Sequence, residues 1–431
     1  MRPGARIKAA IEVLEEVVGR HRPAAAALAD WGKSHRFAGS GDRTAIGNLV
    51  YDALRRRRSL AAQMGADTPR AIALAAASRA LGLPPSGIIA SADGTVHAVE
   101  ALSAAEQAGL TRELPADTPV AVRGDFPDWL TPSFERVFGS AAAEEGAALA
   151  RRAPVDLRVN ALKADREKVL KALARFAPMP TPLSPLGVRL AAPEGPSRTP
   201  NVEAEGGHGK GWYEVQDEAS QIAALMAGAA PRAQVLDICA GAGGKTLALA
   251  GAMRNTGQIY AYDEDAARLR PIFERLKRAG VRNAQVLAAG DKAALAALGP
   301  RFDLVFVDAP CTGTGVWRRR PDAKWRLKPA NLAQRQEEQR AVLESAAALV
   351  KPGGRVVYVT CSVLAEENGD QVRWFVANHA GFVTLPWRQA WTAGVGGTPP
   401  ASADDGEDAL LLTPGRHGTD GFFIAVLSRQ G

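Results

Sequence analysis

Cysteine is scarce in this chain, with three residues among 431, at Cys239, Cys311 and Cys361. They form no C-x-x-C pair and accompany no histidine cluster, so neither a structural zinc site nor a disulfide scaffold is expected. An apolar run of membrane-spanning length is also missing. Residues 1–22 carry acidic side chains within an apolar periodicity, which predicts an amphipathic helix in place of a signal peptide. We expect a cytoplasmic protein in a reducing compartment, without a metal site or a membrane partner.

A strong excess of either charge is absent as well. The formal net charge is +7 and the isoelectric point is near 9.4. This balance favours a polyanionic partner such as nucleic acid, although a mild basic excess is common in ordinary enzymes. A chain of 431 residues with 46% hydrophobic content is too long for one ordinary core. We therefore expect two or three domains.

Residues 1–125 are rich in alanine and place larger apolar side chains at helical spacing, for example Ile46, Leu49 and Val50. This pattern predicts an all-helical domain. Four consecutive arginines, at 55–58, end one of the expected helices. The run fits a solvated helix C-terminus favoured by the helix dipole, and it also fits a phosphate-binding patch. The sequence leaves both interpretations open.

Residues 126–212 consist of short segments rich in proline and glycine, which predicts a linker and a small mixed α/β subdomain. Residues 213–431 alternate strand and helix patterns at the spacing of a doubly wound sheet, with helical patterns at 264–279 and 331–350. We predict a Rossmann-like sheet for this third domain. Its strand candidates are 234–240, 258–263, 284–291, 302–310, 355–362 and 421–429.

A glycine-rich turn, DICAGAGGKT at 237–246, follows the first of these strands, where backbone can approach a ligand closely. It is not a P-loop, because G-x-x-x-x-G-K-[ST] would require glycine in place of Cys239. Asp263 closes the second strand, where a carboxylate can accept both ribose hydroxyls, and Asp291 closes the third, where it can accept an adenine amino group. A nucleoside bound without a phosphate cradle suits S-adenosylmethionine better than NAD or ATP. The predicted cofactor-binding residues are Cys239, Ala240, Gly241, Ala242, Gly243, Gly244, Lys245, Asp263, Arg268, Asp291 and Asp308.

Cys311 and Cys361 follow the fourth and fifth strand candidates. In a parallel sheet both would emerge at the carboxyl edge, where doubly wound folds bind ligands. A single free cysteine is usually a small buried hydrophobe. Two at the same edge, beside Asp308, favour a reactive pair.

Several motifs together resemble the Sun or RsmB family of RNA 5-methylcytosine methyltransferases. The resemblance covers about 130–431, and more loosely the first 125 residues. Ala242 stands where the family often has proline and Thr312 where it often has serine, and neither change removes a reacting group. The motifs are DICAGAGGKT (237–246), DAPCTGTG (308–315), WRRRPDAKW (317–325) and VTCSVLAEEN (359–368), with shorter likenesses in RVNALK (158–163), QDEASQ (216–221) and HGTDGFF (417–423).

The resemblance implies a class I methyltransferase domain with a mostly parallel seven-stranded sheet, preceded by a small α/β RNA-binding subdomain and a NusB-like helical RNA-binding domain. It assigns to Cys361 the attack on carbon 6 of cytosine. Carbon 5 is a poor nucleophile, and this attack makes it reactive enough to accept a methyl group. Cys311 is implied to assist product release. The residues alone leave this order open, since DNA cytosine methyltransferases use a cysteine after proline, the setting of Cys311. We expect Asp308 to hold ring nitrogen 3 and Lys245 to help lower a thiol pKa.

The segment Trp317–Pro321 offers cations and an aromatic ring, so it fits an RNA-facing arm or a solvated charged loop. RNA is the expected partner, ribosomal in preference to transfer RNA, and the protein is expected to act as a monomer. The alternatives are a transfer-RNA cytosine-5 methyltransferase, a catalytically silent RNA-binding ribosome-assembly factor, and a methyltransferase of an exocyclic amine in DNA. The last needs no thiol, and the intact reacting groups count against the silent factor.

Overall fold

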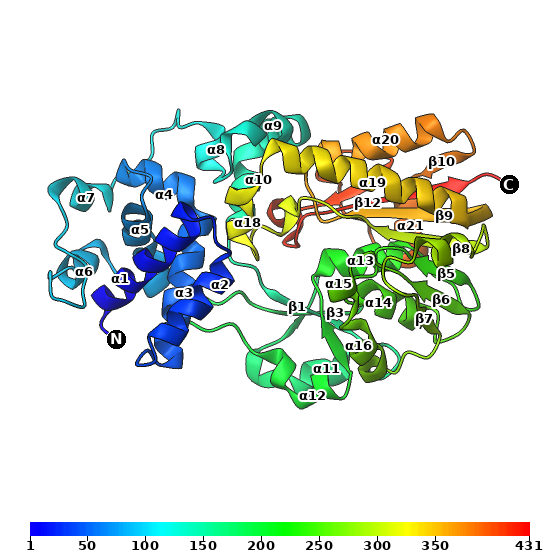
Figure 1. The fold of residues 1–431 in the computed structure, drawn as a ribbon, viewed down its shortest axis with the longest axis horizontal. Coiled ribbons are helices and arrows are strands. Elements are labelled where there is room, and N and C mark those ends of the chain that lie inside the picture. Colours follow the sequence, from blue (N-terminus) through cyan, green and yellow to red (C-terminus); the bar gives the residue numbers. More distant parts are fainter. The chain divides into compact units, whose positions relative to one another are not determined.

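The computed structural model describes all residues 1–431 and divides them into two compact units (Figure 1). The helical unit comprises Met1–Ala153, Ala192–Thr199 and Trp317–Leu327. The sheet unit comprises Pro154–Ala191, Pro200–Val316 and Lys328–Gly431. Each unit therefore draws on segments that are distant in sequence.

The secondary structure of the helical unit consists of helices, as its alanine-rich periodicity predicts. No single helix is long and apolar enough to cross a membrane. Helices α5 (Pro69–Leu81) and α6 (Pro85–Ser91), bent by 119° relative to each other, reach the required length and hydropathy only when they are taken together. The α-helices are α1 (Pro3–Leu14), α2 (Ala24–Ser34), α3 (Ser40–Arg55), α4 (Arg57–Met64), α5 (Pro69–Leu81), α6 (Pro85–Ser91), α7 (Ala104–Gly109), α8 (Val120–Arg123), α9 (Thr131–Phe138), α10 (Ala142–Leu149) and α18 (Pro321–Arg326).

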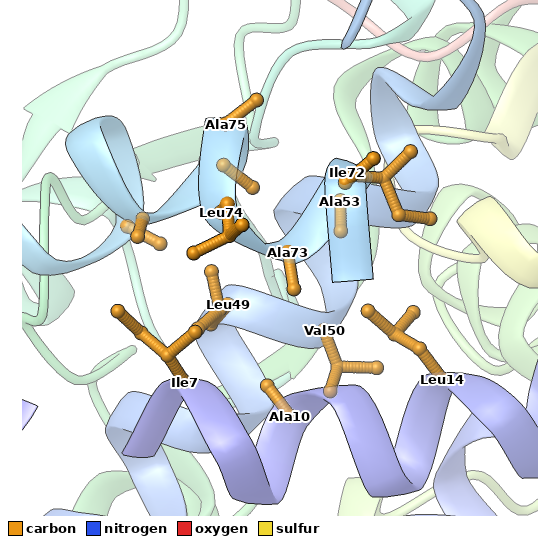
Figure 2. Close-up of a cluster of buried hydrophobic side chains, with 14 of the residues drawn as sticks. Ile7, Ala10, Leu14, Leu49, Val50, Ala53, Ile72, Ala73, Leu74 and Ala75 are labelled. Carbon is orange, nitrogen blue, oxygen red and sulfur yellow. The ribbon is translucent and has the colours of Figure 1, made fainter. Parts of the chain in front are cut away.

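The core of the helical unit lies between α1, α3 and α5. Figure 2 shows Ile7, Leu49 and Leu74 converging from these three helices, and all three side chains are fully buried. The alanines around them keep the helices close, since they add little side-chain bulk. Helix α5 begins where the hydroxyl of Thr68 accepts a hydrogen bond from the amide of Ala71 at 3.2 Å, a standard N-cap.

The boundary expected at residue 125 differs from that of the compact unit, which continues to Ala153. Helices α9 and α10 pack with the helical unit because aromatic side chains join them to it. The ring of Phe134 stacks on Phe126 with centroids 4.2 Å apart, and on Trp317 at 6.1 Å. Arg152 also binds the carboxylate of Asp52 at 2.6 Å.

The small α/β subdomain is present as a four-stranded antiparallel sheet in the order β2-β3-β1-β4. Its last strand uses residues that were assigned to the third domain, because Leu157 and Val159 of β1 pair with Val215 and Tyr213. The subdomain therefore extends beyond residue 212. Its elements are β1 (Val155–Val159), α11 (Arg166–Ala172), β2 (Met179–Pro180), β3 (Gly187–Leu190), α12 (Gly206–Gly209) and β4 (Tyr213–Val215).

The large sheet has the order β10-β12-β9-β8-β5-β6-β7, with β11 paired to β12. It confirms the predicted Rossmann-like, mostly parallel sheet: β5 to β9 pair in parallel, and β12 runs antiparallel between β9 and β10. Two short strands, β10 and β11, were not predicted. The strands are β5 (Gln234–Asp237), β6 (Gln258–Ala261), β7 (Ala284–Val286), β8 (Phe302–Asp308), β9 (Val350–Thr360), β10 (Phe382–Leu385), β11 (Ala409–Leu412) and β12 (Phe422–Arg429).

Helices cover both faces of this sheet (Figure 1). α13 and α14 lie on one face, where their apolar side chains share a core with the strands, and α19 and α20 lie on the other. The helical pattern at 264–279 is divided in the structure, because a proline, Pro271, interrupts it between α15 and α16. The helices are α13 (Glu218–Met226), α14 (Gly244–Ala252), α15 (Ala266–Leu269), α16 (Ile272–Ala279), α17 (Lys292–Ala296), α19 (Pro329–Leu349), α20 (Gly369–Asn378), α21 (Trp387–Gly394) and α22 (Pro414–His417).

Candidate functional site

The glycine loop joins β5 to α14 at the carboxyl edge of the large sheet. Gly241 and Gly243 have φ of +49° and +83°, a region that favours glycine. A Cβ on Gly243 would also lie 2.4 Å from Cγ1 of Ile272. The shape of the loop therefore depends on glycine at these two positions.

Two arginines support the carbonyl groups of this loop. Arg158, on β1 of the small sheet, donates to the carbonyl of Gly244 at 2.7 Å, and Arg275 donates to that of Ala242 at 2.9 Å. The amide of Ala240 meanwhile donates to the carbonyl of Tyr262 at 2.8 Å. Burial lowers the pKa of Arg158 to about 10. Neither arginine was predicted as a site residue, because both reach the loop through tertiary structure.

Asp263 lies beside the loop at the end of β6, where the sequence placed it. Its Oδ2 accepts a hydrogen bond from the amide of Gly241 and its Oδ1 one from Asp265, both at 2.9 Å. A guanidinium nitrogen of Arg268 is 3.9 Å from Oδ2. Asp263, only 3% exposed, therefore couples the β6 end to the glycine loop.

A cavity of about 720 Å³ adjoins these residues. Of the predicted cofactor residues, Cys239, Asp263 and Arg268 line it. One side of α19 also lines it, which was not predicted, since amphipathic spacing does not tell a ligand-facing side from a core-facing one. The lining residues of α19 are Arg335, Glu338, Ala341, Val342, Ser345, Ala348 and Leu349.

Asp291 has a structural role that was not expected. Its carboxylate caps α17 by accepting a hydrogen bond from the amide of Ala294 at 2.9 Å. The neighbouring Lys292 and Leu295 line the cavity, but Asp291 is not among the lining residues. The acidic residue after the third strand is therefore a helix cap, and its contact with adenine stays a prediction.

Asp237 is a buried acid beneath the glycine loop. Its Oδ2 accepts a hydrogen bond from the hydroxyl of Thr246 at 2.6 Å, while its Oδ1 has no hydrogen-bond partner in the protein. Burial raises the pKa of Asp237 to about 7. A buried acceptor without a partner is costly, which suggests that a donor binds here during function.

Cys311 and Cys361 lie at the ends of the paired parallel strands β8 and β9. Their Sγ atoms are 3.4 Å apart and both thiols are free. The pKa of the Cys311 thiol is raised, first by its hydrogen bond to Cys361 and then by burial. The third cysteine, Cys239, is elsewhere on the edge, and its pKa is raised by burial and by nearby carboxylates. The structure thus brings together the two thiols that the sequence paired.

Hydrogen bonds between the two loops fix this arrangement. The amide of Gly315 donates to the carbonyl of Cys361 at 2.9 Å, and the amide of Val363 donates to the hydroxyl of Thr314 at 2.9 Å. The carbonyl of Gly315 accepts from Gly421 at 2.8 Å. A Cβ on Gly315 would lie 2.1 Å from the carbonyl oxygen of Gly421. The loops and the start of β12 are therefore packed backbone to backbone.

Lys245 pairs with Asp308 at the site. Its ammonium donates to Oδ2 of Asp308 at 2.6 Å, and it lies 5.3 Å from the ring centroid of Phe422. The pKa of the Cys311 thiol is raised, first by its hydrogen bond to Cys361 and then by burial, and the effect expected of Lys245 on a thiol stays a prediction. Lys245 orients Asp308 at the end of β8.

The predicted RNA-facing arm is largely part of the core of the helical unit. Trp317 is 1% exposed and Arg318 is 4% exposed, so the ring cannot stack on a base. The carbonyl of Arg318 accepts a hydrogen bond from Arg55 at 2.9 Å. Arg319 and Arg320 are exposed and remain candidates for phosphate contacts.

The arginine run at 55–58 lies at the C-terminus of α3, as one interpretation predicts, but three of its side chains are paired within the helical unit. α3 ends at Arg55 and α4 begins at Arg57. Arg55 binds Asp52 at 3.0 Å, Arg57 binds Asp67 at 2.9 Å, and Arg58 binds Asp128. These ion pairs give the run a structural role within the helical unit.

Two family models match the chain. One, described as 16S rRNA methyltransferase RsmB/F, matches residues 225–428. The other, described as an RsmF/B-like, ferredoxin-like domain, matches residues 126–195. The second match includes the small antiparallel sheet up to β3.

Relatives and a solved structure agree with these matches. A protein of Synechocystis sp. named probable ribosomal RNA small subunit methyltransferase B is 34% identical over 309 residues, which are 70% of this chain and 67% of the relative. The ribosomal RNA small subunit methyltransferase B of Sodalis glossinidius is 33% identical, over 68% of each chain. The solved structure of PH0851 has a TM-score of 0.74 at 26% identity, covering 100% of this chain and 99% of that one. The chain therefore belongs to the 16S rRNA methyltransferase RsmB/F family.

Proposed function

We propose that this protein is an S-adenosylmethionine-dependent RNA cytosine-5 methyltransferase that acts on small-subunit ribosomal RNA through a covalent adduct with Cys361. The observation that carries the proposal is the pair of free thiols, 3.4 Å apart, at the ends of β8 and β9. Methylation of an exocyclic amine needs no thiol, whereas carbon 5 of cytosine requires a nucleophile at carbon 6. The names of the relatives point to ribosomal RNA in preference to transfer RNA.

The residues around the glycine loop fit S-adenosylmethionine. The cavity of about 720 Å³ accommodates a nucleoside-sized ligand. Asp263 at its wall can accept ribose hydroxyls, and the partnerless Oδ1 of Asp237 can accept from an ammonium group. When bound, S-adenosylmethionine supplies an electrophilic methyl group on its sulfonium. We keep the glycine loop, Asp263 and Arg268 as its binding residues, and Asp291, which caps α17, as the acceptor for the adenine amino group.

The protein's own part in the reaction begins with the thiolate of Cys361. Its Sγ forms a bond to carbon 6 of cytosine, and the electrons of the 5,6 double bond move toward carbon 5, which becomes nucleophilic. Asp308, whose Oδ2 accepts from Lys245 at 2.6 Å, holds the base edge at ring nitrogen 3. When Asp308 carries a proton, it donates that proton to nitrogen 3 and so limits the negative charge on the ring.

The adduct must then be resolved. A base removes the proton from carbon 5, the double bond re-forms, and the bond between carbon 6 and the Cys361 sulfur breaks. Cys311, 3.4 Å from that sulfur, can donate a hydrogen bond to it as it leaves. Product release is therefore the step assigned to Cys311.

The RNA must deliver an unstacked cytosine to this edge, which for a paired base means flipping it out at a cost of a few kcal/mol. We propose that the small antiparallel sheet and the helical unit, as a NusB-like domain, select the RNA. We further propose that the protein acts as a cytoplasmic monomer. The exposed Arg319 and Arg320 are the part of the arm that can contact phosphates.

The test is bisulfite sequencing of total RNA from cells with and without the protein. A cytosine of small-subunit ribosomal RNA should lose its protection when the protein is absent. Loss of protection in transfer RNA would identify the other substrate. If no cytosine changes while the purified protein still binds ribosomal RNA, the catalytically silent assembly factor is correct.

A further inference from the structure

Glu367 is a buried carboxylate that the proposed mechanism does not use. It lies in the turn Ala365–Glu367 after Cys361 and is 0% exposed. Its Oε1 accepts a hydrogen bond from the amide of Thr312 at 2.8 Å, and its Oε2 one from the hydroxyl of Thr312 at 2.5 Å. It therefore holds the residue that directly follows Cys311.

Gln339, on α19, holds the residue on the other side of Cys311. Its Nε2 donates to the carbonyl of Pro310 at 2.9 Å and to Oε1 of Glu367 at 3.0 Å. Gln339 is also fully buried. Both peptides that flank Cys311 are thus held by one pair of side chains, Gln339 and Glu367.

The same pair is connected to the strand that carries Cys361. The hydroxyl of Tyr358, on β9, donates to the carbonyl of Glu367 at 2.6 Å. The next residue, Asn368, accepts from the hydroxyl of Thr360 at 2.6 Å and donates to the carbonyl of Ser362 at 3.0 Å. Glu367 is therefore fixed relative to both thiols.

We propose that Glu367 is a positioning residue of the thiol pair: together with Gln339 it fixes the peptides on both sides of Cys311, and its carboxylate opposes the loss of a proton from Cys311. The proposal rests on the function proposed above. Two thiols 3.4 Å apart do not both lose their protons readily, because the second negative charge would be buried beside the first. The carboxylate of Glu367 is among the causes that raise the pKa of the Cys311 thiol, so it favours the protonated form of Cys311.

The charged and titratable groups around Cys311 agree with this assignment. Cys361 and Tyr358 face it from β9, and Glu367 from the following turn. The α19 side contributes the neutral Gln339. Asp308 is already paired with Lys245. Besides its bond to Cys361 and its burial, the negative charge of Glu367 is among the causes that raise the pKa of the Cys311 thiol.

The test uses the full-length protein without RNA or cofactor. Each thiol is pulse-alkylated with iodoacetamide at a series of pH values, and its peptide is quantified by mass spectrometry, since trypsin separates the three cysteines. Glu367→Gln keeps the size of the side chain and removes its charge. We expect alkylation of Cys311 near pH 8 to become about tenfold faster, which corresponds to a pKa lowered by about one unit. Cys239 serves as the internal control.

Two further variants separate positioning from a general loss of structure. Gln339→Leu removes the bond to Pro310 and should also speed alkylation of Cys311. Glu344→Gln, a surface change on the same helix that removes a partner of His379, should leave it unchanged. In methylation assays Glu367→Gln should lower kcat with little change in KM for RNA, and the covalent adduct should persist on a denaturing gel.

The outcomes distinguish this inference from the proposed function. If Cys311 is alkylated with the wild-type pH profile in Glu367→Gln, the inference is wrong, whether or not the protein methylates cytosine. If the profile shifts as expected but no 5-methylcytosine forms with the wild-type protein, the thiol pair is organised as described and the proposed function is wrong. If Glu367→Gln does not fold, Gln339→Leu decides, and an unchanged Cys311 profile there overturns the inference.

Discussion

Sγ of Cys311 lies 3.4 Å from Sγ of Cys361, although 50 residues separate them in sequence. The separation is set by the loops around the thiols, where the hydroxyls of Thr314 and Ser362 are 3.0 Å apart and backbone bonds join the two segments. The thiols themselves are not bonded covalently. Replacing one of them should therefore leave the other in place, which makes the pair accessible to single substitutions.

Gly243→Ala should destabilise the sheet unit. Alanine at φ of +83° is strained, and its Cβ would meet Cγ1 of Ile272 at 2.4 Å, so we expect a loss of about 1 to 3 kcal/mol in the free energy of unfolding. Gly251→Ala on the same helix is the matched control, because a Cβ there meets nothing within 4 Å and alanine favours helix. Urea denaturation of both variants checks this; equal stabilities would mean that the loop tolerates a side chain.

Asp263→Ala should weaken binding of S-adenosylmethionine by about 1.5 to 3 kcal/mol, the range for hydrogen bonds to a charged group. The carboxylate also holds the amide of Gly241 at 2.9 Å, so the loop loses a support at the same time. Isothermal titration calorimetry measures the change, with Glu274→Gln, an exposed position on α16, as control. An affinity equal to that of the wild type would remove Asp263 from the cofactor site.

The arginines of the arm should separate into two classes. Replacing Arg319 and Arg320 together by alanine should flatten the salt dependence of RNA binding by up to about 0.7 log units for each lost phosphate contact. Arg318→Ala should leave that slope unchanged and lower the melting temperature, because Arg318 is 4% exposed. A filter-binding salt series and a thermal melt test both statements. A slope that changes only with Arg318 would reverse the assignment.

The sequence predicted correctly which residues follow the carboxyl ends of the parallel strands, because its signals are local. A buried strand followed by glycine, or by cysteine and a small residue, marks a carboxyl end, and parallel pairing then brings Asp263, Asp308, Cys311 and Cys361 to one edge. The prediction needed only the strand order of a doubly wound sheet. Even where β9 begins earlier than expected, at Val350, its carboxyl end remained correct to within about two residues.

The features that were not predicted from the sequence depend on contacts between distant segments. Trp317 and Arg318 read as an exposed arm because tryptophan among arginines suits a nucleic-acid surface, yet partners such as Phe134 and Arg55 bury them. Asp291 occupies the position of an adenine-binding acid and serves as a helix cap. Glu367 belongs to the motif VTCSVLAEEN, but no local pattern shows that it meets Gln339 around Cys311.

Lys324 gives the helical unit a pH-dependent stability. Its side chain is 1% exposed, its ammonium donates to the carbonyl of Arg55 at 2.8 Å, and burial lowers its pKa from 10.5 to about 7. Between these values the unfolded chain binds a proton that the folded protein lacks, so stability should rise with pH by at most about 1.4 kcal/mol per unit. Below pH 7 Lys324 is charged in the folded protein too, so the free-energy cost of burying its ammonium group is fully present.

Lys324→Met should therefore be more stable relative to wild type at pH 6.5 than at pH 9. Lys33→Met, whose side chain in the wild type is 78% exposed, should show no such trend. Thermal melts of the three proteins across this range make the comparison. A constant difference between Lys324→Met and wild type would mean that Lys324 keeps an ordinary pKa.

The two thiols should fail differently when they are replaced. Cys361→Ser should abolish methylation and leave no covalent species with RNA, since a hydroxyl near neutral pH is far less nucleophilic than a thiolate. The Cys311→Ala protein should still form the adduct through Cys361 and transfer the methyl group. It lacks the thiol that in the wild type lies 3.4 Å from the leaving sulfur, so the adduct should persist as a slow, RNase-sensitive band on a denaturing gel.

The reverse pattern would exchange the roles. If the band forms with Cys361→Ser and disappears with Cys311→Ala, the cysteine that follows Pro310 is the nucleophile, as in DNA cytosine methyltransferases. If both variants methylate RNA at the wild-type rate, the thiols only pack the edge of the sheet. In that case the covalent mechanism proposed for Cys361 is wrong, because neither thiol at the ends of β8 and β9 would be needed for methyl transfer.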